Sequence, residues 1–214
     1  MEMQSAESQF LEMLQTPPEI VASTLQQQAA APYCGLGFKK SRLDADLHAH
    51  MLEMLAQCVP LFRAEVRIDA IESRRPDVIP ALYYEDRAFN DVVARALQPA
   101  HEEWCGMRLE KSACYGFRVY QRGAYLHRHV DRTKTHIISA TICVDHRLDS
   151  RWPLYIEDIH GKPHQVDLEP GELLFYEGAR LIHGRPYPLN GDYYAGMFVH
   201  YRPLLASAPE PCEG

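Results

Sequence analysis

The feature that most constrains the fold of this chain is a series of short segments that follows residue 112. The segments are CYGFRVYQ, AYLHRHV, HIISATICVD, PLYIED, HQVDLE, ELLFYE and YYAGMFVHYRP. They are rich in aromatic and β-branched residues, and Gly, Pro, Asp or Asn residues divide them. Segments of this kind at short spacing are typical of antiparallel strands in a sandwich or barrel. We therefore predict a jelly-roll β core.

The first 110 residues carry a different pattern, because their apolar residues recur at helical spacing. Amphipathic helices are expected over residues 44–62, with Asp44 as the N-cap, and over residues 88–104. A shorter helix is expected over SAESQFLEMLQ, and the alternating segment AEVRIDAIES suggests a strand. The predicted core positions of the two longer helices are Leu47, Met51, Met54, Leu55, Cys58 and Phe62, then Phe89, Val93, Ala96, Leu97, Ala100 and Trp104.

Helices followed by strands predict an α+β fold, in which N-terminal helices pack outside the β core. A length of 214 residues suits one compact domain. The expected organisation is a mainly helical part over residues 1–110, a jelly-roll core over 112–203 and a tail over 204–214. Residues 73–90, which include SRRPDVIP and YYEDRAF, form either a lid or ordinary linkers. In a lid, Tyr83, Tyr84 and Arg87 would contact the substrate.

Composition and charge exclude several classes of protein. Hydrophobic residues make up 46% of the chain and charged residues 24%, which fits a folded globular protein and not a disordered one. The net charge of −7 argues against nucleic-acid or anionic-membrane partners. No apolar run reaches the length of a membrane span and no signal-peptide pattern begins the sequence, so we expect a cytoplasmic protein. The six cysteines form no C-x-x-C pair and are expected to be reduced.

The triplet HVD, within YQRGAYLHRHVDRTKTHIISATICVD, places an imidazole and a carboxylate two residues apart. On an extended chain His129 and Asp131 leave from one face, so both can converge on one atom. A structural His–Asp pair would show the same spacing. A third candidate ligand is His183, in ARLIHGRPYP before the last predicted strand. Two imidazoles and one carboxylate around an ion with open positions are the geometry of non-haem Fe(II) oxygenases.

Neighbouring segments add a family resemblance. Tyr120, in RVYQRG, precedes HVD, and LEPGELLFYEG and HGRPYPLNGDYYAGMFVHY follow it in order. From Tyr120 to Pro203 the sequence resembles the 2-oxoglutarate- and Fe(II)-dependent oxygenase superfamily, in its prolyl 4-hydroxylase-like branch. The resemblance implies a double-stranded β-helix core with Fe(II) held by His129, Asp131 and His183. It also implies 2-oxoglutarate as a cosubstrate that chelates the iron, O2 as the oxidant, and ascorbate as a reductant.

The residue that pairs with the distal carboxylate of 2-oxoglutarate departs from the family pattern. Prolyl hydroxylases carry a lysine at the position that Tyr193 takes here. A phenol donates a hydrogen bond but has no charge near neutral pH, so Arg185 is the first candidate and Tyr120 a helper. Arg185 could instead pair with an acidic neighbour such as Glu177. The fallback candidates are Arg147 and Arg151.

The roles of several other aromatic and histidine residues are not decided by the sequence. His127 shares a strand face with His129 but lacks a carboxylate at the same offset, so it lines the site or faces solvent. His136 either reaches the site or is a core histidine, and His200 is interpreted as structural. Trp152 either packs or forms a substrate platform. Six histidines are expected on the surface or in loops: His48, His50, His101, His146, His160 and His164.

The resemblance predicts an enzyme that hydroxylates an unactivated C–H bond and releases succinate and CO2. Because related halogenases lack the carboxylate ligand, the presence of Asp131 favours hydroxylation. The substrate would be a small molecule or a peptide, such as a free amino acid or a prolyl residue. Two alternatives remain: a cupin-like hydrolase or isomerase using the same ligands with zinc and water, and a non-catalytic jelly-roll sensor of iron or oxygen. The segment HGRPYPLNGDYY favours the oxygenase.

Overall fold

The computed structural model describes residues 35–65 and 80–204. Within these residues the chain forms a seven-stranded sheet, in the order β1-β9-β6-β11-β4-β3-β2, and a four-stranded sheet, in the order β5-β10-β7-β8. Neighbouring strands are antiparallel in both sheets. The elements are β1 (Phe38–Arg42), α2 (Ala45–Cys58), the 3-10 turn η2 (Val59–Leu61), β2 (Arg63–Ala64), β3 (Leu82–Tyr84), α3 (Arg87–Cys105), β4 (Leu109–Gln121), β5 (Leu126–His129), β6 (Ile138–Leu148), β7 (Leu154–Glu157), β8 (Pro163–Val166), β9 (Glu172–Tyr176), β10 (His183–Arg185) and β11 (Gly191–Pro203).

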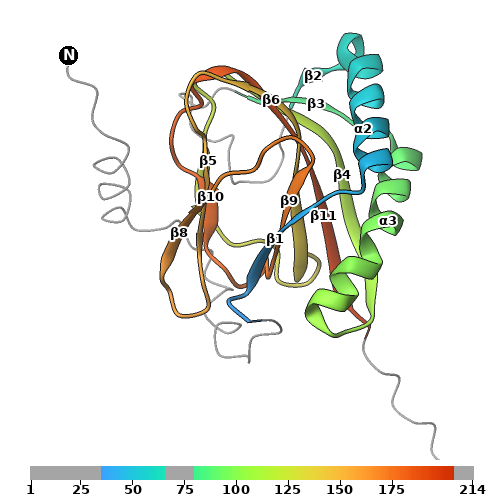
Figure 1. Ribbon diagram of the computed structural model, residues 1–214, viewed down its shortest axis with the longest axis vertical. Helices are drawn as coiled ribbons and strands as arrows, with labels where there is room; N and C mark the ends of the chain where they lie inside the picture. The colour runs from blue at the N-terminus through green and yellow to red at the C-terminus, as the bar shows by residue number, and fades with distance from the viewer. Residues whose placement is uncertain (1–34, 66–79, 205–214) are drawn as a thin grey trace, which may run out of the picture.

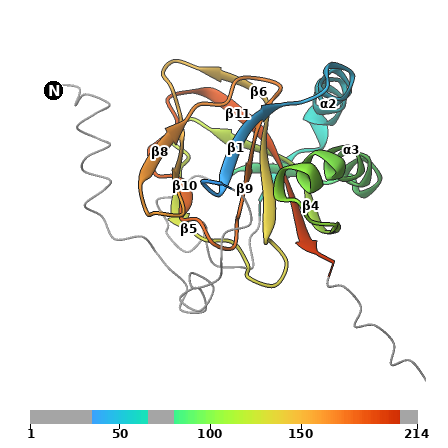
Figure 2. The same cartoon turned by 60° about the horizontal axis from the view of Figure 1, so that its bottom comes forward.

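The two sheets face each other, and both helices lie on the outer side of the larger sheet (Figures 1 and 2). One apolar core fills the space between the helices and this sheet and includes Met51, Val93 and Ile142. A second core lies between the sheets and includes Ile156 of β7 and Tyr194 of β11. This architecture is the predicted jelly roll buttressed by helices. The inner faces of its two sheets are where side chains from distant segments converge.

The helix predicted over residues 44–62 is confirmed as α2, with Asp44 as its N-cap. Asp44 Oδ1 accepts hydrogen bonds from the backbone N–H groups of Asp46 and Leu47, at 3.0 and 3.2 Å. These bonds satisfy donors that the start of a helix leaves free. Met51 and Cys58 are buried, and the other predicted core positions are partly buried against the same core.

The second helix is also confirmed, but its buried face differs in detail from the prediction. Ala96 and Ala100 are exposed, whereas Ala94 and His101 are buried. Alanine occurs on both faces of this helix, so the alanines carry little information about its orientation. Gly106, with φ at 70°, ends the helix in the left-handed region that favours glycine.

The predicted surface position of His101 is wrong, because this histidine is fully buried. Its ring centroid lies 4.3 Å from that of Phe175 and 4.6 Å from that of Tyr201, and Nδ1–H donates to Leu97 O at 2.8 Å. Burial penalises the imidazolium and lowers the pKa of His101 to about 4. This histidine is therefore a neutral core residue of the helix–sheet interface.

The seven predicted strand segments correspond to β4–β9 and β11, while β1, β3 and the three-residue β10 were not foreseen. Within the segment predicted as a lid or linker, β3 pairs with β4 and α3 begins at Arg87. Tyr84 packs against the helix-side core, with its ring centroid 6.2 Å from that of Phe62. The segments SAESQFLEMLQ and SRRPDVIP, and most of AEVRIDAIES, lie outside the described residues.

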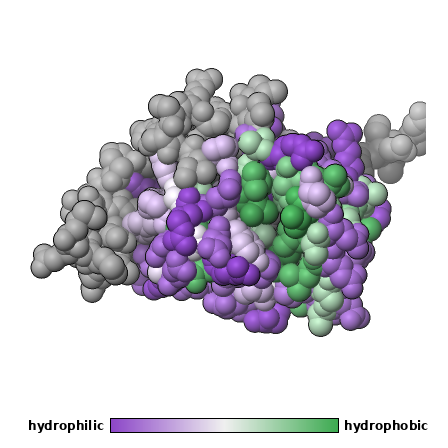
Figure 3. Space-filling view, turned by 90° about the horizontal axis from the view of Figure 1, so that it is seen from above, coloured by the Kyte–Doolittle hydropathy of each residue, from purple (hydrophilic) through white to green (hydrophobic). Residues whose placement is uncertain are grey.

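The surface of the described part carries a few large apolar side chains. Those of α2, η2 and α3 are Leu52, Val59, Leu61 and Val92. On the face seen in Figure 3, apolar residues gather between polar ones. None of the helices that the structure describes is long and apolar enough to cross a membrane. The cysteines at positions 58, 105, 114 and 143 are free, as expected for reduced thiols.

Candidate metal centre

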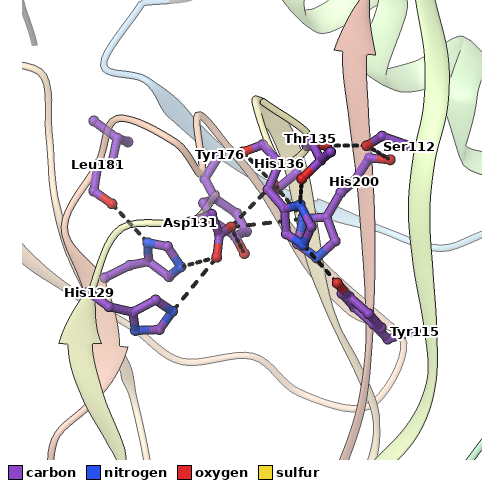
Figure 4. A network of polar contacts seen from close by, with 11 residues as sticks. Ser112, Tyr115, His129, Asp131, Thr135, His136, Tyr176, Leu181 and His200 are labelled. Carbon is purple, nitrogen blue, oxygen red and sulfur yellow. Dashed lines mark hydrogen bonds and ion pairs between the residues drawn. The ribbon is translucent and has the colours of Figure 1, made fainter. Parts of the chain in front are cut away.

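The three residues singled out from the sequence meet between the two sheets. His129 ends β5 and His183 begins β10, and the two are direct partners in the antiparallel ladder. Asp131 follows β5 by two residues, and its N–H donates to Gly178 O at 2.8 Å. One potential ligand atom from each of the three side chains lies within 4.8 Å of the others. Figure 4 shows the carboxylate of Asp131 facing the two imidazole rings.

Both imidazoles bond through Nδ1 to the backbone carbonyl two residues earlier, so that Nε2 of each ring faces the centre. His129 Nδ1–H donates to His127 O at 2.7 Å, and His183 Nδ1–H donates to Leu181 O at 2.8 Å. A carbonyl can only accept, so each Nδ1 carries the proton and each Nε2 keeps its lone pair. Both Nε2 atoms lie 3.7 Å from Asp131 Oδ1. Carbonyl bonds of this kind fix metal-binding histidines in many proteins.

The charge on Asp131 lacks a cationic partner in the described part of the chain. Its side chain is 11% exposed, and its ion-pair contacts are with histidines. Burial raises the pKa of this carboxyl above its ordinary value. Burial also lowers the pKa of His183 to about 4, which keeps that imidazole neutral. Two imidazoles with Nε2 directed at a buried carboxylate suit a divalent cation, because the ion would compensate the carboxylate charge. The donor set therefore fits the metal expected from the sequence.

Gly178 forms one wall of this centre. A Cβ atom at this position would lie 2.3 Å from Asp131 Oδ2 and 2.5 Å from Ser139 Oγ. Both distances are far below ordinary contact distance, so any side chain here would displace the carboxylate. The glycine belongs to the segment LEPGELLFYEG, which supplied part of the family resemblance.

Further residues contact Asp131 that the sequence had not indicated. Tyr176 donates its hydroxyl to Asp131 Oδ2 at 3.4 Å, and its ring centroid lies 4.6 Å from that of His183. Burial and the neighbouring carboxylate raise the pKa of Tyr176 well above its usual value, so the phenol stays protonated. Ser139 Oγ lies 3.5 Å from the same carboxylate oxygen. Tyr176 lies within LEPGELLFYEG, but neither residue was assigned a role from the sequence, because polar side chains within a strand pattern resemble ordinary buried residues.

Two histidines stack beside this carboxylate. The ring centroids of His136 and His200 lie 3.8 Å apart, and His200 Nδ1 is 2.8 Å from Ser139 Oγ. His136 in turn contacts Tyr115 through Nε2 and the hydroxyl, at 3.0 Å. Burial lowers the pKa of both histidines, most strongly that of His200. The cluster connects β4, β6 and β11 to the metal centre (Figure 4).

Arg185 lies two residues beyond His183 on β10 and is almost completely buried. Its guanidinium carbon lies 4.5 Å from the ring centroid of Trp152 and 4.3 Å from that of Tyr194. It donates to Trp152 O, and to the hydroxyl of Tyr194 at 2.8 Å. Among the described residues no carboxylate is within ion-pair distance of Arg185, and Glu177 pairs with Arg180 at 3.0 Å. The suggested Arg185–Glu177 pair is therefore wrong.

Of the other residues predicted to bind the distal carboxylate, one lies near Arg185 and three do not. Tyr120 is buried beside Arg185's aromatic neighbours, with its ring centroid 5.2 Å from that of Trp152. Tyr193 is not brought to this cluster: its hydroxyl donates to Asp145 at 2.5 Å, and the next residue, Tyr194, contacts Arg185. The fallback residues Arg147 and Arg151 are surface arginines paired with Asp192 and Asp167.

Two remaining assignments are resolved by position. His127 offers its carbonyl to His129, and its own ring packs edge-on against Tyr125 at a centroid distance of 4.9 Å. The residue that joins the metal-ligand cluster is thus His129, not His127. Trp152 is buried, and its Nε1–H donates to Tyr187 O at 2.7 Å, which favours the packing role over an exposed substrate platform.

Comparison with known proteins gives a likeness in structure alone. No protein-family model and no curated protein sequence matches the chain. A prolyl-4-hydroxylase from Pseudomonas putida is 17% identical, with a TM-score of 0.58 over 86% of this chain and 99% of that one. The 2-oxoglutarate-dependent epimerase SnoN of nogalamycin biosynthesis is 14% identical, with a TM-score of 0.62 over 85% and 83%. HygX from Streptomyces hygroscopicus, solved with nickel, 2-oxoglutarate and hygromycin B, is 11% identical, with a TM-score of 0.55 over 87% and 89%.

These likenesses establish the fold. The chain has the double-stranded β-helix fold of prolyl hydroxylases and other 2-oxoglutarate-dependent oxygenases. The resemblance first seen in a few motifs of the C-terminal region is thereby confirmed as a structural one, and it extends over most of the chain.

Proposed function

We propose that this chain is an Fe(II)- and 2-oxoglutarate-dependent dioxygenase that hydroxylates an unactivated C–H bond. The observation that carries the proposal is the pair of carbonyl-anchored imidazoles that face one buried carboxylate oxygen at 3.7 Å each. This two-histidine, one-carboxylate set is characteristic of non-haem Fe(II) oxygenases. The shared fold supports the same class, but the ligands and their orientation supply the chemical argument.

His129, Asp131 and His183 would hold the iron, each through one atom. When bound, Fe(II) supplies the activation of O2 that drives oxidation of the cosubstrate and the substrate. The protein's part is to keep both imidazoles neutral and oriented, and to keep Asp131 ionised next to the cation. The retained carboxylate supports hydroxylation over halogenation.

Arg185 supplies the anchor for the distal carboxylate of 2-oxoglutarate. A buried guanidinium without an acidic partner in the described residues is costly, and an anionic cosubstrate would compensate it. Two residues along a strand separate it from His183, which is about 7 Å at the usual rise. The rings of Trp152 and Tyr194 both pack against the guanidinium, so its remaining donors are preorganised for a carboxylate. Tyr120 would assist from the same cluster.

The substrate is proposed at the level of class: a small molecule or a peptide. The structural neighbours are named for different chemistries, which include prolyl 4-hydroxylation and epimerisation. A zinc-dependent hydrolase or isomerase with the same three ligands would not need a buried arginine to bind a dicarboxylate cosubstrate. That arginine therefore favours the oxygenase.

The proposal is tested with protein purified under anaerobic conditions. Fe(II), ascorbate, 2-oxoglutarate and O2 are added, and succinate is followed with wild type and with Asp131→Ala. We expect slow succinate formation by the wild type, even without a prime substrate, and none by the variant. A metal-loaded wild type that fails to bind 2-oxoglutarate would refute the proposal and favour the hydrolase.

The cosubstrate anchor has its own matched pair of variants. Arg185→Gln is expected to weaken 2-oxoglutarate binding about 10- to 100-fold, as for loss of a charge-assisted contact. Arg151→Gln removes a surface arginine of similar size and is expected to leave binding unchanged, because Arg151 pairs with Asp167. Equal dissociation constants for both variants would assign the anchor elsewhere. Calorimetric titration of the Fe(II)-loaded protein without O2 measures both.

A further inference from the structure

We propose that Ser139 and His200 are positioning residues that hold one oxygen of Asp131 away from the metal. The metal would then be bound by the other oxygen of Asp131 only. The inference rests on the proposed function only in that a metal ion occupies the three-residue site. It does not require 2-oxoglutarate or any particular substrate.

The two oxygens of Asp131 have different surroundings. Oδ1 lies 3.7 Å from His129 Nε2 and 3.7 Å from His183 Nε2, so it faces the position where the imidazoles converge. Oδ2 lies 3.4 Å from the hydroxyl of Tyr176, 3.5 Å from Ser139 Oγ and 3.8 Å from His200 Nδ1. The carboxylate thus spans the gap between the metal ligands and a buried polar cluster (Figure 4).

The hydrogen bonds of this cluster form a chain in which His200 donates to Ser139 and Ser139 donates to Asp131. A serine hydroxyl has a single proton, and Ser139 can give it to Asp131 Oδ2 or to His136 O, at 3.5 and 3.4 Å. An ionised carboxylate is the stronger acceptor, so the proton goes to Asp131. Ser139 Oγ then accepts from His200 Nδ1–H at 2.8 Å. Ser139 and His200 are 0% and 3% exposed, which leaves little access for water to replace either donor.

His200 is itself fixed by neighbours from other elements. Its ring stacks on His136 at 3.8 Å between centroids and meets Tyr115 edge-on at 5.4 Å. By contrast, Ser112 Oγ donates to the backbone carbonyl of His200, at 3.0 Å, and so does not orient its ring. The imidazole that supports Ser139 therefore has a defined orientation, which is what a residue acting through another must have.

A carboxylate ligand can bind a metal through one oxygen or through both. If Oδ2 lost the Ser139 donor, only the longer-range contact with His200 and the hydroxyl of Tyr176, at 3.4 Å, would remain beside it. Asp131 could then turn so that both oxygens approach the ion, and one more coordination position would be used. The serine–histidine pair would thus preserve the open positions at which other ligands bind. This role differs from packing, because it depends on the hydrogen-bond donor and not on the ring.

Two substitutions of His200 separate the donor from the ring. His200→Asn keeps a side-chain N–H at the same distance from Cα as Nδ1 but removes the ring. His200→Phe keeps a ring that can stack on His136 but removes the donor. Our proposal predicts that the Asn variant resembles wild type in metal binding and that the Phe variant does not, whereas a packing role predicts the opposite order.

The measurement uses Co(II) alone, with its dissociation constant by calorimetry and its visible ligand-field spectrum. We expect His200→Phe and Ser139→Ala to bind Co(II) about 10- to 100-fold more weakly, the range for lost outer-sphere partners, with altered spectra. His200→Asn should stay near wild type. So should Ser112→Ala, a matched control that removes a hydroxyl from the same cluster without touching Asp131.

The outcomes distinguish this inference from the proposed function. Wild-type Co(II) binding and spectra in His200→Phe and Ser139→Ala would overturn the positioning role. So would equal losses in Ser139→Ala and Ser112→Ala. A wild type that binds Co(II) but does not bind 2-oxoglutarate would refute the dioxygenase, and the variant series would still decide the role of His200. A wild type that does not bind Co(II) would overturn both.

Discussion

Replacement of Gly178 by alanine tests the metal centre most directly, because it moves a ligand without removing one. The new Cβ would lie 2.3 Å from Asp131 Oδ2 and 3.0 Å from His136 O. Ordinary contact needs about 3.5 Å, so the carboxylate must shift by roughly 1 Å. Gly178 is outside the left-handed region, so the alanine backbone itself is not strained.

The magnitude follows from that displacement. Crowding of this kind costs about 1–3 kcal/mol of folding stability. A ligand misplaced by about 1 Å is expected to reduce succinate formation by around 100-fold. Co(II) affinity should fall about 10- to 100-fold. Calorimetric titration with Co(II), the coupled succinate assay and thermal unfolding give the three values for the same preparation.

The control is Gly106→Ala, at the end of α3. Gly106 has φ at +70°, and no neighbouring atom lies within 4 Å of the position that a methyl group would take, so alanine there strains only the backbone. It should cost about 1 kcal/mol of stability and leave Co(II) binding unchanged. If Gly178→Ala bound Co(II) as tightly as this control, the assignment of Asp131 Oδ1 and its neighbours to a metal centre would be refuted.

Three more outcomes are expected. Because the pKa of His101 is lowered to about 4, the unfolded chain binds the extra proton first, and stability is lost as pH falls from about 6.5 toward 4. His101→Phe should remove about 3 kcal/mol of that acid sensitivity, and equal pH slopes in urea unfolding would contradict this. Tyr194→Phe, which deletes the acceptor of Arg185, should weaken 2-oxoglutarate binding about 2- to 10-fold, whereas Tyr193→Phe should not. Saturating Mn(II) should raise the melting temperature of wild type, a chelator should reverse the rise, and Asp131→Ala should show neither.

The sequence predicted the fold class, and it singled out the three side chains that meet in the candidate metal centre, from patterns that are local. Strand alternation, turn residues and the HVD spacing survive folding almost unchanged, because each depends on a few consecutive residues. The third ligand could be proposed from its place between two predicted strands. The pairing of His183 with His129 in an antiparallel ladder could not be predicted, because the three residues of β10 show no periodicity.

The surroundings of Arg185, the proposed cosubstrate anchor, show where counting residues along the sequence fails. The family position leads to Tyr193, but β11 has a register irregularity between Gly191 and Tyr193, and another between Ala195 and Gly196. Irregularities of this kind change which face a given residue takes. Tyr194 therefore contacts Arg185, while Tyr193 binds Asp145.

Residues that act through tertiary contacts were also missed. Ser139 and His200 lie on neighbouring strands 61 positions apart in the sequence, and their relation to Asp131 exists only in the folded chain. His101 was missed for a similar reason, because a histidine among polar helix residues gives no sign that aromatic rings will surround it. Polar residues in the interior are recognised by their partners, which sequence patterns do not reveal.

The ladder pairing of His129 with His183 couples metal binding to the alignment of two short strands. A slip of one residue between β5 and β10 would turn the imidazoles to opposite sides of the sheet. Only the native alignment could then be cross-linked by a bound cation. Loading with metal should thus slow amide hydrogen exchange in β5 and β10 more than in β4 or β11, which draw their order from long pairings and from the helices behind them.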